Sequence, residues 1–159
     1  MSTPNAFCSK AELELAVGGA VKLRQLADPD NTGTAVDAIV DDYLETGAAE
    51  VRSAAEIKHD PEVLKSLDAD SLRRCRDANA ALSARTAYVK GGHGQAMPPF
   101  VEAAAERADD FLDMLAKGLR RLGRVSGGKS AAINQPCGVV DPDALGSGVS
   151  IAGFRRGFR

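Results

Sequence analysis

The stretch from Pro98 to Leu122 constrains the fold of this chain more than any other part of the sequence. It reads PPFVEAAAERADDFLDMLAKGLRRL. Two prolines open it, and a first helical turn tolerates them because its backbone N–H groups have no partner within the helix. Apolar residues then recur every three or four positions: Phe100, Ala104, Ala108, Phe111, Leu115, Leu119 and Leu122. This spacing predicts an amphipathic helix of about seven turns, at roughly 3.6 residues per turn, whose apolar face is buried against another element.

The partner that we expect for this helix is the preceding run, from Ser71 to Val89. Asp70 precedes it as a helix cap, and Gly91-Gly92 ends it. Because the link to the next helix is short, the two helices are expected to be antiparallel. The expected inward face of the helix over 71–89 consists of Leu72, Cys75, Leu82, Thr86 and Val89.

The first 67 residues predict further helices, separated by turns. Ser9 and Glu12 have the spacing of a capping box, and the short helix that they begin is expected to stop at Gly18-Gly19. A second short helix is expected over 20–26 and a longer one over 35–58, weakened by about 1 kcal/mol at Gly47. Asp60-Pro61 reads as a cap and first residue of a short helix. The inward face of the longer helix is expected to be Val36, Val40, Tyr43, Val51 and Ala54.

Composition points to the same fold class. Aromatic residues make up only 4% of the chain and there is no Trp, so Leu, Val and Ala must fill the core. Small side chains let helices approach closely, which favours helices over a β-sandwich. We therefore expect an all-α fold, a small bundle of three main helices plus short ones, formed by a helical domain over 1–122 and followed by a long extended C-terminal arm over 123–159.

The C-terminal 37 residues differ in charge and composition from the rest. They hold five basic and two acidic residues, a net charge of +3, whereas residues 1–122 hold 15 basic and 20 acidic residues, a net charge of −5. The segment is rich in Gly, Ser and Pro but carries scattered apolar groups. It is expected to become ordered only against a partner. Fully extended, it would reach on the order of 100 Å at about 3.3 Å per residue.

Cysteine usage and hydropathy suggest a reducing compartment. Cys8, Cys75 and Cys137 are an odd number with no CxxC pair, which argues against a disulfide framework. The first ten residues lack the apolar core of a signal peptide. No apolar run approaches the roughly 18 residues of a membrane span. We expect a protein that is cytoplasmic at synthesis and has no membrane partner.

Two motifs resemble ligand sites without the context that such sites need. Residues 123–130, GRVSGGKS, match the phosphate-binding pattern GxxxxGK[ST]. That loop requires a buried strand before it and a helix after it, whereas here a charged helix precedes the motif and Pro136 breaks the segment after it. Asp28, Asp30 and Gly33 occupy three positions of a calcium loop, but Ile39 stands where the bidentate Glu belongs. We favour an accidental match for the first motif and a tight turn for the second.

No catalytic, metal or cofactor site is expected. His59 and His93 are the only histidines, and neither has a ligand partner at metal-site spacing. Cys75 is expected to pack as a small hydrophobe. Helix spacing places most carboxylates of the Pro98–Leu122 helix on its outer surface, beside Arg107 and Lys117. These carboxylates are Glu102, Glu106, Asp109, Asp110 and Asp113. We expect the protein not to be an enzyme.

The chain ends in aromatic and basic residues that suit a docking segment. The candidate site residues are Phe154, Arg155, Arg156, Phe158 and Arg159. Such residues can stack on bases and hold phosphates. They can equally fill an apolar pocket on a protein and pair with carboxylates at its rim. We favour a protein partner, because the basic residues are concentrated in the tail while the body is acidic.

Several segments together give the chain a resemblance to a known family. These are SKAELE (9–14), LRQLADPDNTGT (23–34), VDAIVDDYLETGAAEV (36–51), RDANAALSA (76–84) and ADDFLDMLAKGL (108–119). In them the chain resembles the head-to-tail connector (adaptor) proteins of tailed bacteriophages, in particular the Mu-like connector family. The resemblance covers roughly residues 5–122. It departs around 52–67, where the family more often has Tyr- and Pro-rich sequence.

The resemblance implies a structural virion protein of the neck, assembled in the host cytoplasm. It would be a subunit of a homo-oligomeric, dodecameric ring between the portal protein and a tail-side neck or tail-terminator protein. The C-terminal residues would dock on the portal or a neighbouring subunit. Genomic DNA would pass through the ring without specific binding, which an acidic wall would favour because DNA binding is driven largely by phosphate neutralisation.

Two other functions remain open. The first is a small helical nucleic-acid-binding or regulatory protein that grips phosphate with its basic tail. It predicts DNA binding that weakens steeply with salt. The second is a nucleotide-binding enzyme, which predicts that ATP with Mg²⁺ raises the melting temperature.

Overall fold

The computed structural model describes residues 6–33, 36–92 and 95–124. The chain divides into a unit formed by residues 1–125 and a second unit formed by 126–159, which lies outside the described residues. The described part is all-α, as the sequence predicts, and holds three long helices and three short ones. The long helices are α3 (Val36–Glu56), α5 (Ala69–Gly91) and α6 (Pro99–Ala116), and the short ones are α1 (Lys10–Val17), α2 (Ala20–Ala27) and α4 (Pro61–Leu64).

Helix α1 begins and ends, and helix α4 begins, at the residues that the sequence singles out, whereas α4 is shorter than expected and ends at Leu64. The Ser9 side chain and the Glu12 side chain form the predicted capping box of α1. Gly18 ends α1 in the left-handed conformation, with φ of 99°, which favours glycine because other residues place a Cβ too close to the backbone. Asp60 caps α4 and Pro61 is its first residue. Local capping chemistry therefore sets these boundaries.

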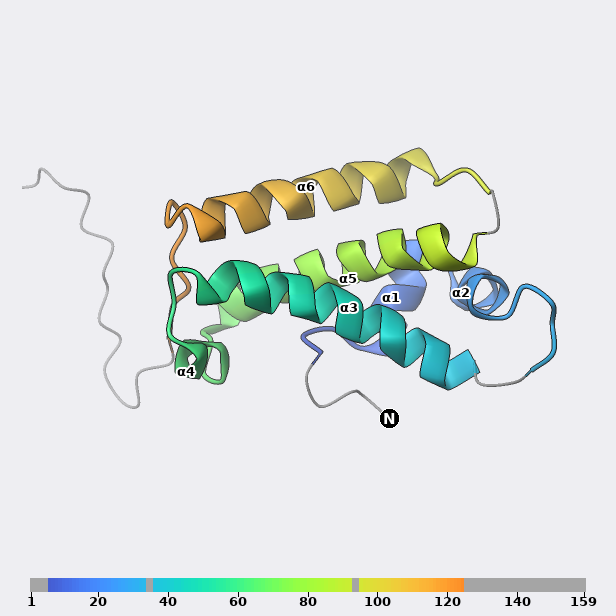
Figure 1. Ribbon diagram of the computed structural model, residues 1–159, viewed down its shortest axis with the longest axis horizontal. Coiled ribbons are helices and arrows are strands. Elements are labelled where there is room, and N and C mark those ends of the chain that lie inside the picture. Colours follow the sequence, from blue (N-terminus) through green and yellow to red (C-terminus); the bar gives the residue numbers. More distant parts are fainter. Residues whose placement is uncertain (1–5, 34–35, 93–94, 125–159) are drawn as a thin grey trace, which may run out of the picture. The chain divides into compact units, whose positions relative to one another are not determined.

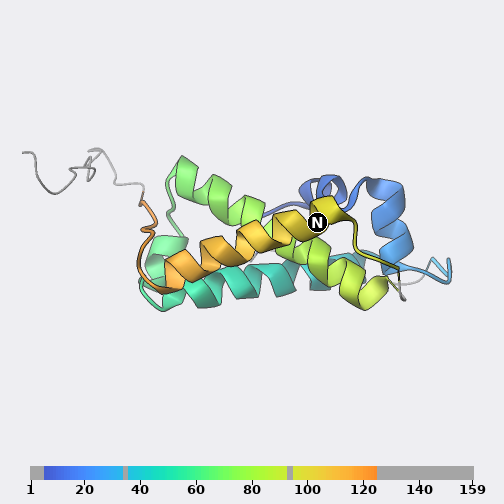
Figure 2. The ribbon, with the colours of Figure 1, turned by 90° about the horizontal axis from the view of Figure 1, so that it is seen from above.

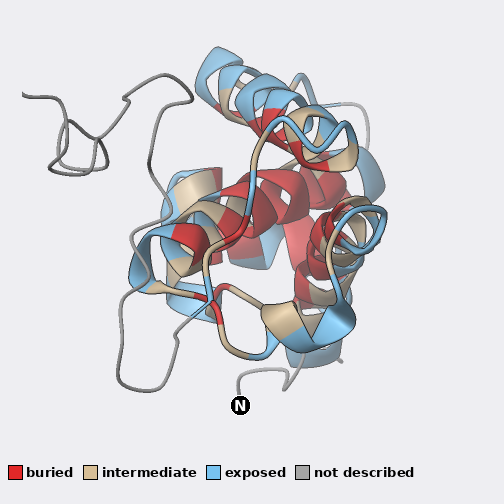
Figure 3. Ribbon diagram, turned by 90° about the vertical axis from the view of Figure 1, so that its left-hand side faces the viewer, coloured by how far each residue is buried: buried red, intermediate tan, exposed pale blue. Residues whose placement is uncertain are grey.

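Helix α5 packs against both other long helices and occupies the centre of the described unit (Figure 1). Its buried residues, red in Figure 3, face the other helices. The helix starts earlier than expected, at Ala69, because Asp68, and not Asp70, accepts the backbone N–H of Ser71 at 2.7 Å. Val89, expected inside, is 72% exposed, whereas Cys75 and Leu82 are fully buried.

Buried apolar residues form two clusters along α3 and α5. One joins α1, α2, the first half of α3, the second half of α5 and Val101 at the start of α6. The hydroxyls of Tyr43 and Tyr88 anchor the short helices to it by donating to the backbone oxygens of Leu26 and Val17, at 3.2 and 3.1 Å. The other cluster joins the second half of α3, the first half of α5 and α6.

A polar contact lies between the two clusters, where α3 and α5 cross. Asn79 and Ser83 are fully buried there, and the Ser83 hydroxyl donates to Oδ1 of Asn79 at 3.1 Å. A Cβ atom at Gly47 would lie 2.5 Å from Oγ of Ser83 and 2.9 Å from the backbone oxygen of Asn79. Gly47 is thus the residue that lets the two backbones approach, and Ala55 replaces the expected Ala54 on the buried face of α3.

Helix α6 is shorter than the sequence predicts, and its buried face is rotated at its start. It ends at Ala116 because Gly118 adopts the left-handed conformation, with φ of 71°. Val101 and Ala105 are buried in place of Phe100, which is 54% exposed, and Leu119 is 76% exposed. Ala108, Phe111, Leu115 and Leu122 are buried as expected.

The chain after α6 returns to the start of α5. The Asp68 backbone N–H donates to the oxygen of Gly123 at 2.9 Å, and the Gly123 N–H donates to Oγ of Ser71 at 2.9 Å. Leu67 and Arg124 form an isolated antiparallel bridge. The first two residues of the expected arm, Gly123 and Arg124, therefore pack on the helical unit.

Candidate functional site

The docking residues proposed from the sequence lie outside the described part of the chain. This holds for Phe154, Arg155, Arg156, Phe158 and Arg159. It also holds for His93, for Cys137 and for residues 125–130 of the phosphate-loop-like string. Their roles remain predictions, and the candidate surfaces below belong to residues 6–124.

In the loop that resembles a calcium site, the Asp28 carboxylate binds backbone N–H groups of the same loop. The Asp28 carboxylate accepts the backbone N–H of Gly33 at 2.6 Å and that of Thr32 at 2.8 Å. These backbone donors, Gly33 first, lower the pKa of Asp28 below its usual value. Both carboxylate oxygens of Asp28 thus serve the turn before α3. Among the described residues, no group of three or more His, Cys, Asp or Glu is placed to hold a metal ion.

The two cysteine thiols and one histidine nitrogen are buried, and two carboxylates of α6 are ion-paired. Burial raises the pKa of the Cys8 thiol to about 12 and that of Cys75 to about 11, so both stay protonated and pack as small hydrophobes. Nε2 of His59 is buried and has no hydrogen-bond partner among the described residues. On α6, Asp109 and Asp113 pair with Arg85 and Lys117 at 2.7 and 2.5 Å.

The outward face of α6 is acidic, as its periodicity predicts. Glu102, Glu106 and Asp110 are exposed, and within residues 6–124 none of them has an ion-pair partner. This row lies opposite the buried face of the helix. It leaves three carboxylates available to solvent or to a partner.

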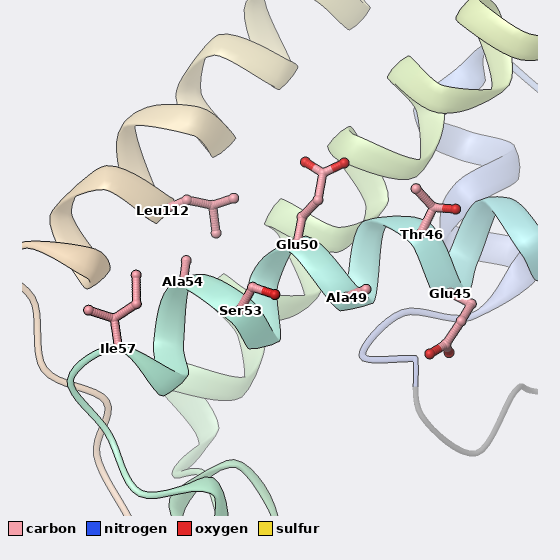
Figure 4. A pocket seen from close by; sticks show the side chains of 8 residues that line it. All are labelled: Glu45, Thr46, Ala49, Glu50, Ser53, Ala54, Ile57 and Leu112. Carbon is pink, nitrogen blue, oxygen red and sulfur yellow. The ribbon is translucent and has the colours of Figure 1, made fainter.

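One open groove runs between α3 and α6. It has a volume of about 710 Å³ and is lined by Glu45, Thr46, Ala49, Glu50, Ser53, Ala54, Ile57 and Leu112. Leu112 reaches from α6 toward α3, and Ile57 closes one end (Figure 4). The charged lining residues are both acidic, so we call this surface the acidic groove.

The two carboxylates of the acidic groove have partners on their own chain. Glu50 accepts a hydrogen bond from Arg85 at 2.9 Å, and Arg85 also binds Asp109 on α6 at 2.7 Å. Glu45 pairs with Arg52, while its second oxygen is buried without a hydrogen-bond partner among the described residues. Arg85 therefore connects α3, α5 and α6 at the groove.

A second groove lies between the first half of α5 and α6. Its volume is about 410 Å³, and its lining is Arg74, Asp77, Ala78, Ala81, Ala104, Arg107, Ala108, Phe111 and Arg120. We call it the arginine groove. Arg74 pairs with Asp70 at 2.8 Å, but Arg107 and Arg120 have no carboxylate within ion-pair distance in the described part of the chain.

Sequence reasoning missed the arginine groove. In the sequence Arg120 lies next to Arg121 and near Arg124, far from Arg74. The structure instead brings Arg120 to Arg74 and Arg107, which are distant in sequence and meet only through the antiparallel packing of α5 and α6. A weak indication of this groove in the sequence is the spacing of the small residues Ala104 and Ala108 beside Arg107.

Comparisons with known proteins add no identification. The chain matches no protein-family model, no curated protein and no solved structure. Within the described residues, no helix has the length and apolar character to cross a membrane. The functional argument therefore rests on the sequence and on these surfaces.

Proposed function

We propose that this chain is a structural subunit of a tailed-bacteriophage neck, a head-to-tail connector that assembles as a ring between the portal and the tail. The observation that carries the proposal is the position of the segments that resemble the connector family. Residues 36–51 lie on α3, residues 76–84 lie on α5, and residues 108–116 lie on α6. The resemblance thus falls on the three helices that form the scaffold.

Surface chemistry supports an assembly role over a chemical one. The grooves beside α6 are open and carry charged rims over apolar residues, which is the composition of protein contact surfaces. The acidic row Glu102, Glu106 and Asp110 would suit a wall along which DNA slides without binding, since phosphates are repelled by carboxylates. In this proposal the protein is not an enzyme and carries no cofactor.

The C-terminal segment is the proposed contact with the portal or a neighbouring subunit. Phe154 and Phe158 would fill apolar pockets, and the arginines beside them would pair with rim carboxylates. Deleting 150–159 is expected to abolish co-sedimentation of the full chain with purified portal from the same phage while leaving the far-UV circular dichroism unchanged. Normal co-sedimentation of the truncated protein would refute the docking role.

A specific observation keeps the nucleic-acid alternative as a second candidate. The arginine groove adds a basic surface on the helical unit to the basic tail. This function predicts DNA binding by the isolated protein whose affinity falls steeply between low and moderate salt. Fluorescence anisotropy with a labelled duplex distinguishes the two functions, because the connector proposal predicts no binding beyond a weak, sequence-independent level.

A further inference from the structure

The chain does not leave the helical unit at the end of α6. Gly118 turns it in the left-handed conformation and Leu119 is 76% exposed, but Leu122 returns to the interior and is only 8% exposed. There it joins the buried cluster that contains Leu67, the residue immediately before the N-cap of α5. Residues 122–124 thus run from α6 to the start of α5 (orange in Figures 1 and 2), and we call them the strap.

Three hydrogen bonds join the strap and the N-terminal cap of α5 into one closed cycle. The Asp68 backbone N–H donates to the Gly123 oxygen, and the Gly123 N–H donates to Oγ of Ser71, both at 2.9 Å. The Ser71 N–H donates to Oδ1 of Asp68 at 2.7 Å, and this last bond is the cap itself. Ser71 is only 6% exposed beneath the strap. Because Asp68 and Ser71 serve both contacts, loss of either contact weakens the other.

The fit between the strap and the cap is close. A Cβ atom at residue 123 would lie 1.8 Å from Oδ2 of Asp68, so only glycine fits there without displacing one of the two. The next residue, Arg124, forms the antiparallel bridge with Leu67, and its Nε donates to Oγ of Ser66 at 3.1 Å. Backbone pairing, side-chain hydrogen bonds and a buried leucine therefore hold the strap together.

We propose that residues 122–124 are a strap that stabilises the first turn of α5 and makes the start of α5, not the end of α6, the attachment point of the C-terminal segment. A partner that pulls on the segment beyond residue 125 then acts on the α5 cap, and opening of the strap loosens that cap. This inference goes beyond the proposed function, because it concerns the chain by itself and holds whatever the C-terminal segment binds.

Ser71→Ala in the full-length chain tests whether the strap supports the cap. The change removes the oxygen that accepts from Gly123 but keeps the backbone N–H that binds Asp68. Ala also has the higher helix propensity, so a cap that did not depend on the strap would be unchanged or more stable. The proposal predicts the opposite: amide hydrogen exchange at residues 71 and 72 rises by roughly five- to tenfold, the effect of losing about one hydrogen bond.

Asp68→Ala tests the coupling in the other direction. It removes the carboxylate of the cap but keeps the backbone N–H that donates to the oxygen of Gly123. Limited trypsin digestion, followed by mass spectrometry, then reports on the strap through cleavage after Arg124. We expect this cleavage to be roughly five- to tenfold faster than in the wild type, because the weakened cap lets the strap open more often.

Gly123→Ala attacks the contact from the strap itself. Its Cβ atom overlaps the Asp68 carboxylate, so both readouts, exchange at the cap and cleavage after Arg124, are expected to increase together. The matched control is Leu119→Ala, which changes a side chain that is 76% exposed just before the strap and should leave both readouts as in the wild type. Circular dichroism checks that every variant keeps its helices.

Three results would overturn the proposal. The first is exchange at residues 71 and 72 that stays unchanged or slows in Ser71→Ala. The second is cleavage after Arg124 that stays at the wild-type rate in Asp68→Ala. The third is cleavage of the wild type after Arg124 as fast as in the urea-unfolded chain. None of these measurements involves the portal, so the strap and the connector function can fail independently.

Discussion

The crossing of α3 and α5 and the flanks of α6 are built in opposite ways. At the crossing, Gly47 lies against Asn79 and Ser83 with no room for a Cβ atom. Beside α6, open surface grooves of about 710 and 410 Å³ lie along the edges of its packing against α3 and against the first half of α5. The difference indicates that the crossing fixes the helical unit, whereas the flanks of α6 remain available to partners.

A buried charge at the crossing should have the largest effect. Asn79→Asp places a carboxyl where the residue is fully buried, and leaving such a charge unpaired costs about 4 kcal/mol of unfolding free energy. Burial raises the pKa of that carboxyl, so the variant should approach the wild type near about pH 4 and lose stability as the pH rises. Urea unfolding near about pH 4 and at neutral pH, for the variant and the wild type, measures the effect.

The control for this change is Asp77→Asn, two residues earlier on α5 and exposed. It should alter the unfolding free energy by no more than about 0.5 kcal/mol. An Asn79→Asp variant that is equally destabilised at low and high pH would show that the position is not buried in the folded protein.

Two substitutions that enlarge a side chain on α3, one at the crossing and one in the acidic groove, compare the two regions directly. Gly47→Ala is expected to cost about 1 to 2 kcal/mol net, because steric overlap with Ser83 and Asn79 outweighs the better helix propensity of Ala. Ala49→Leu adds more atoms two residues away, in the open acidic groove, and should stay within about 0.5 kcal/mol of the wild type. Equal effects in thermal unfolding would contradict the contrast between the two regions.

Acid should act on the helix ends and spare the crossing, which contains no ionisable side chain. Hydrogen bonds from Ser71, its backbone N–H first, lower the pKa of Asp68, and those from Gly33 and Thr32 lower the pKa of Asp28. Their stabilising effect is present above the unfolded-state pKa and is lost as the pH falls below about 4. Hydrogen exchange at falling pH should show earlier opening at the start of α5 than at residues 79–83.

The smallest effect is expected at the flank of α6. Arg85 joins Glu50 on α3 to Asp109 on α6, at 2.9 and 2.7 Å, but all three side chains are partly exposed. Arg85→Ala should therefore cost only about 0.5 to 1 kcal/mol, and less at high salt. A loss of several kcal/mol in urea unfolding would mean that the flank contributes to the fold as much as the crossing does.

The sequence predicted the helices because their signals are local. Periodicity marks α3, α5 and α6, and the caps at Ser9 and Asp60 lie within one turn of the backbone groups that they bind. The end of α6 was misplaced because the apolar spacing continues through Leu119. Gly118, which adopts a left-handed conformation, ends the helix before that spacing does.

Features that depend on tertiary contacts were not predictable in this way. Gly47 reads as a weak point within a helix, and only the packing of α5 against it shows that the position needs a glycine. The two grooves likewise combine residues that are far apart in the sequence, such as Glu50 with Leu112 and Arg74 with Arg120. The connector function rests on resemblance and surface chemistry and remains a proposal.

Electron microscopy of the full-length protein mixed with purified portal from the same phage tests the central claim most directly. The account predicts a ring of copies capping the portal, absent when residues 150–159 are deleted. Well-formed portals that carry no additional density at saturating protein would contradict the connector function.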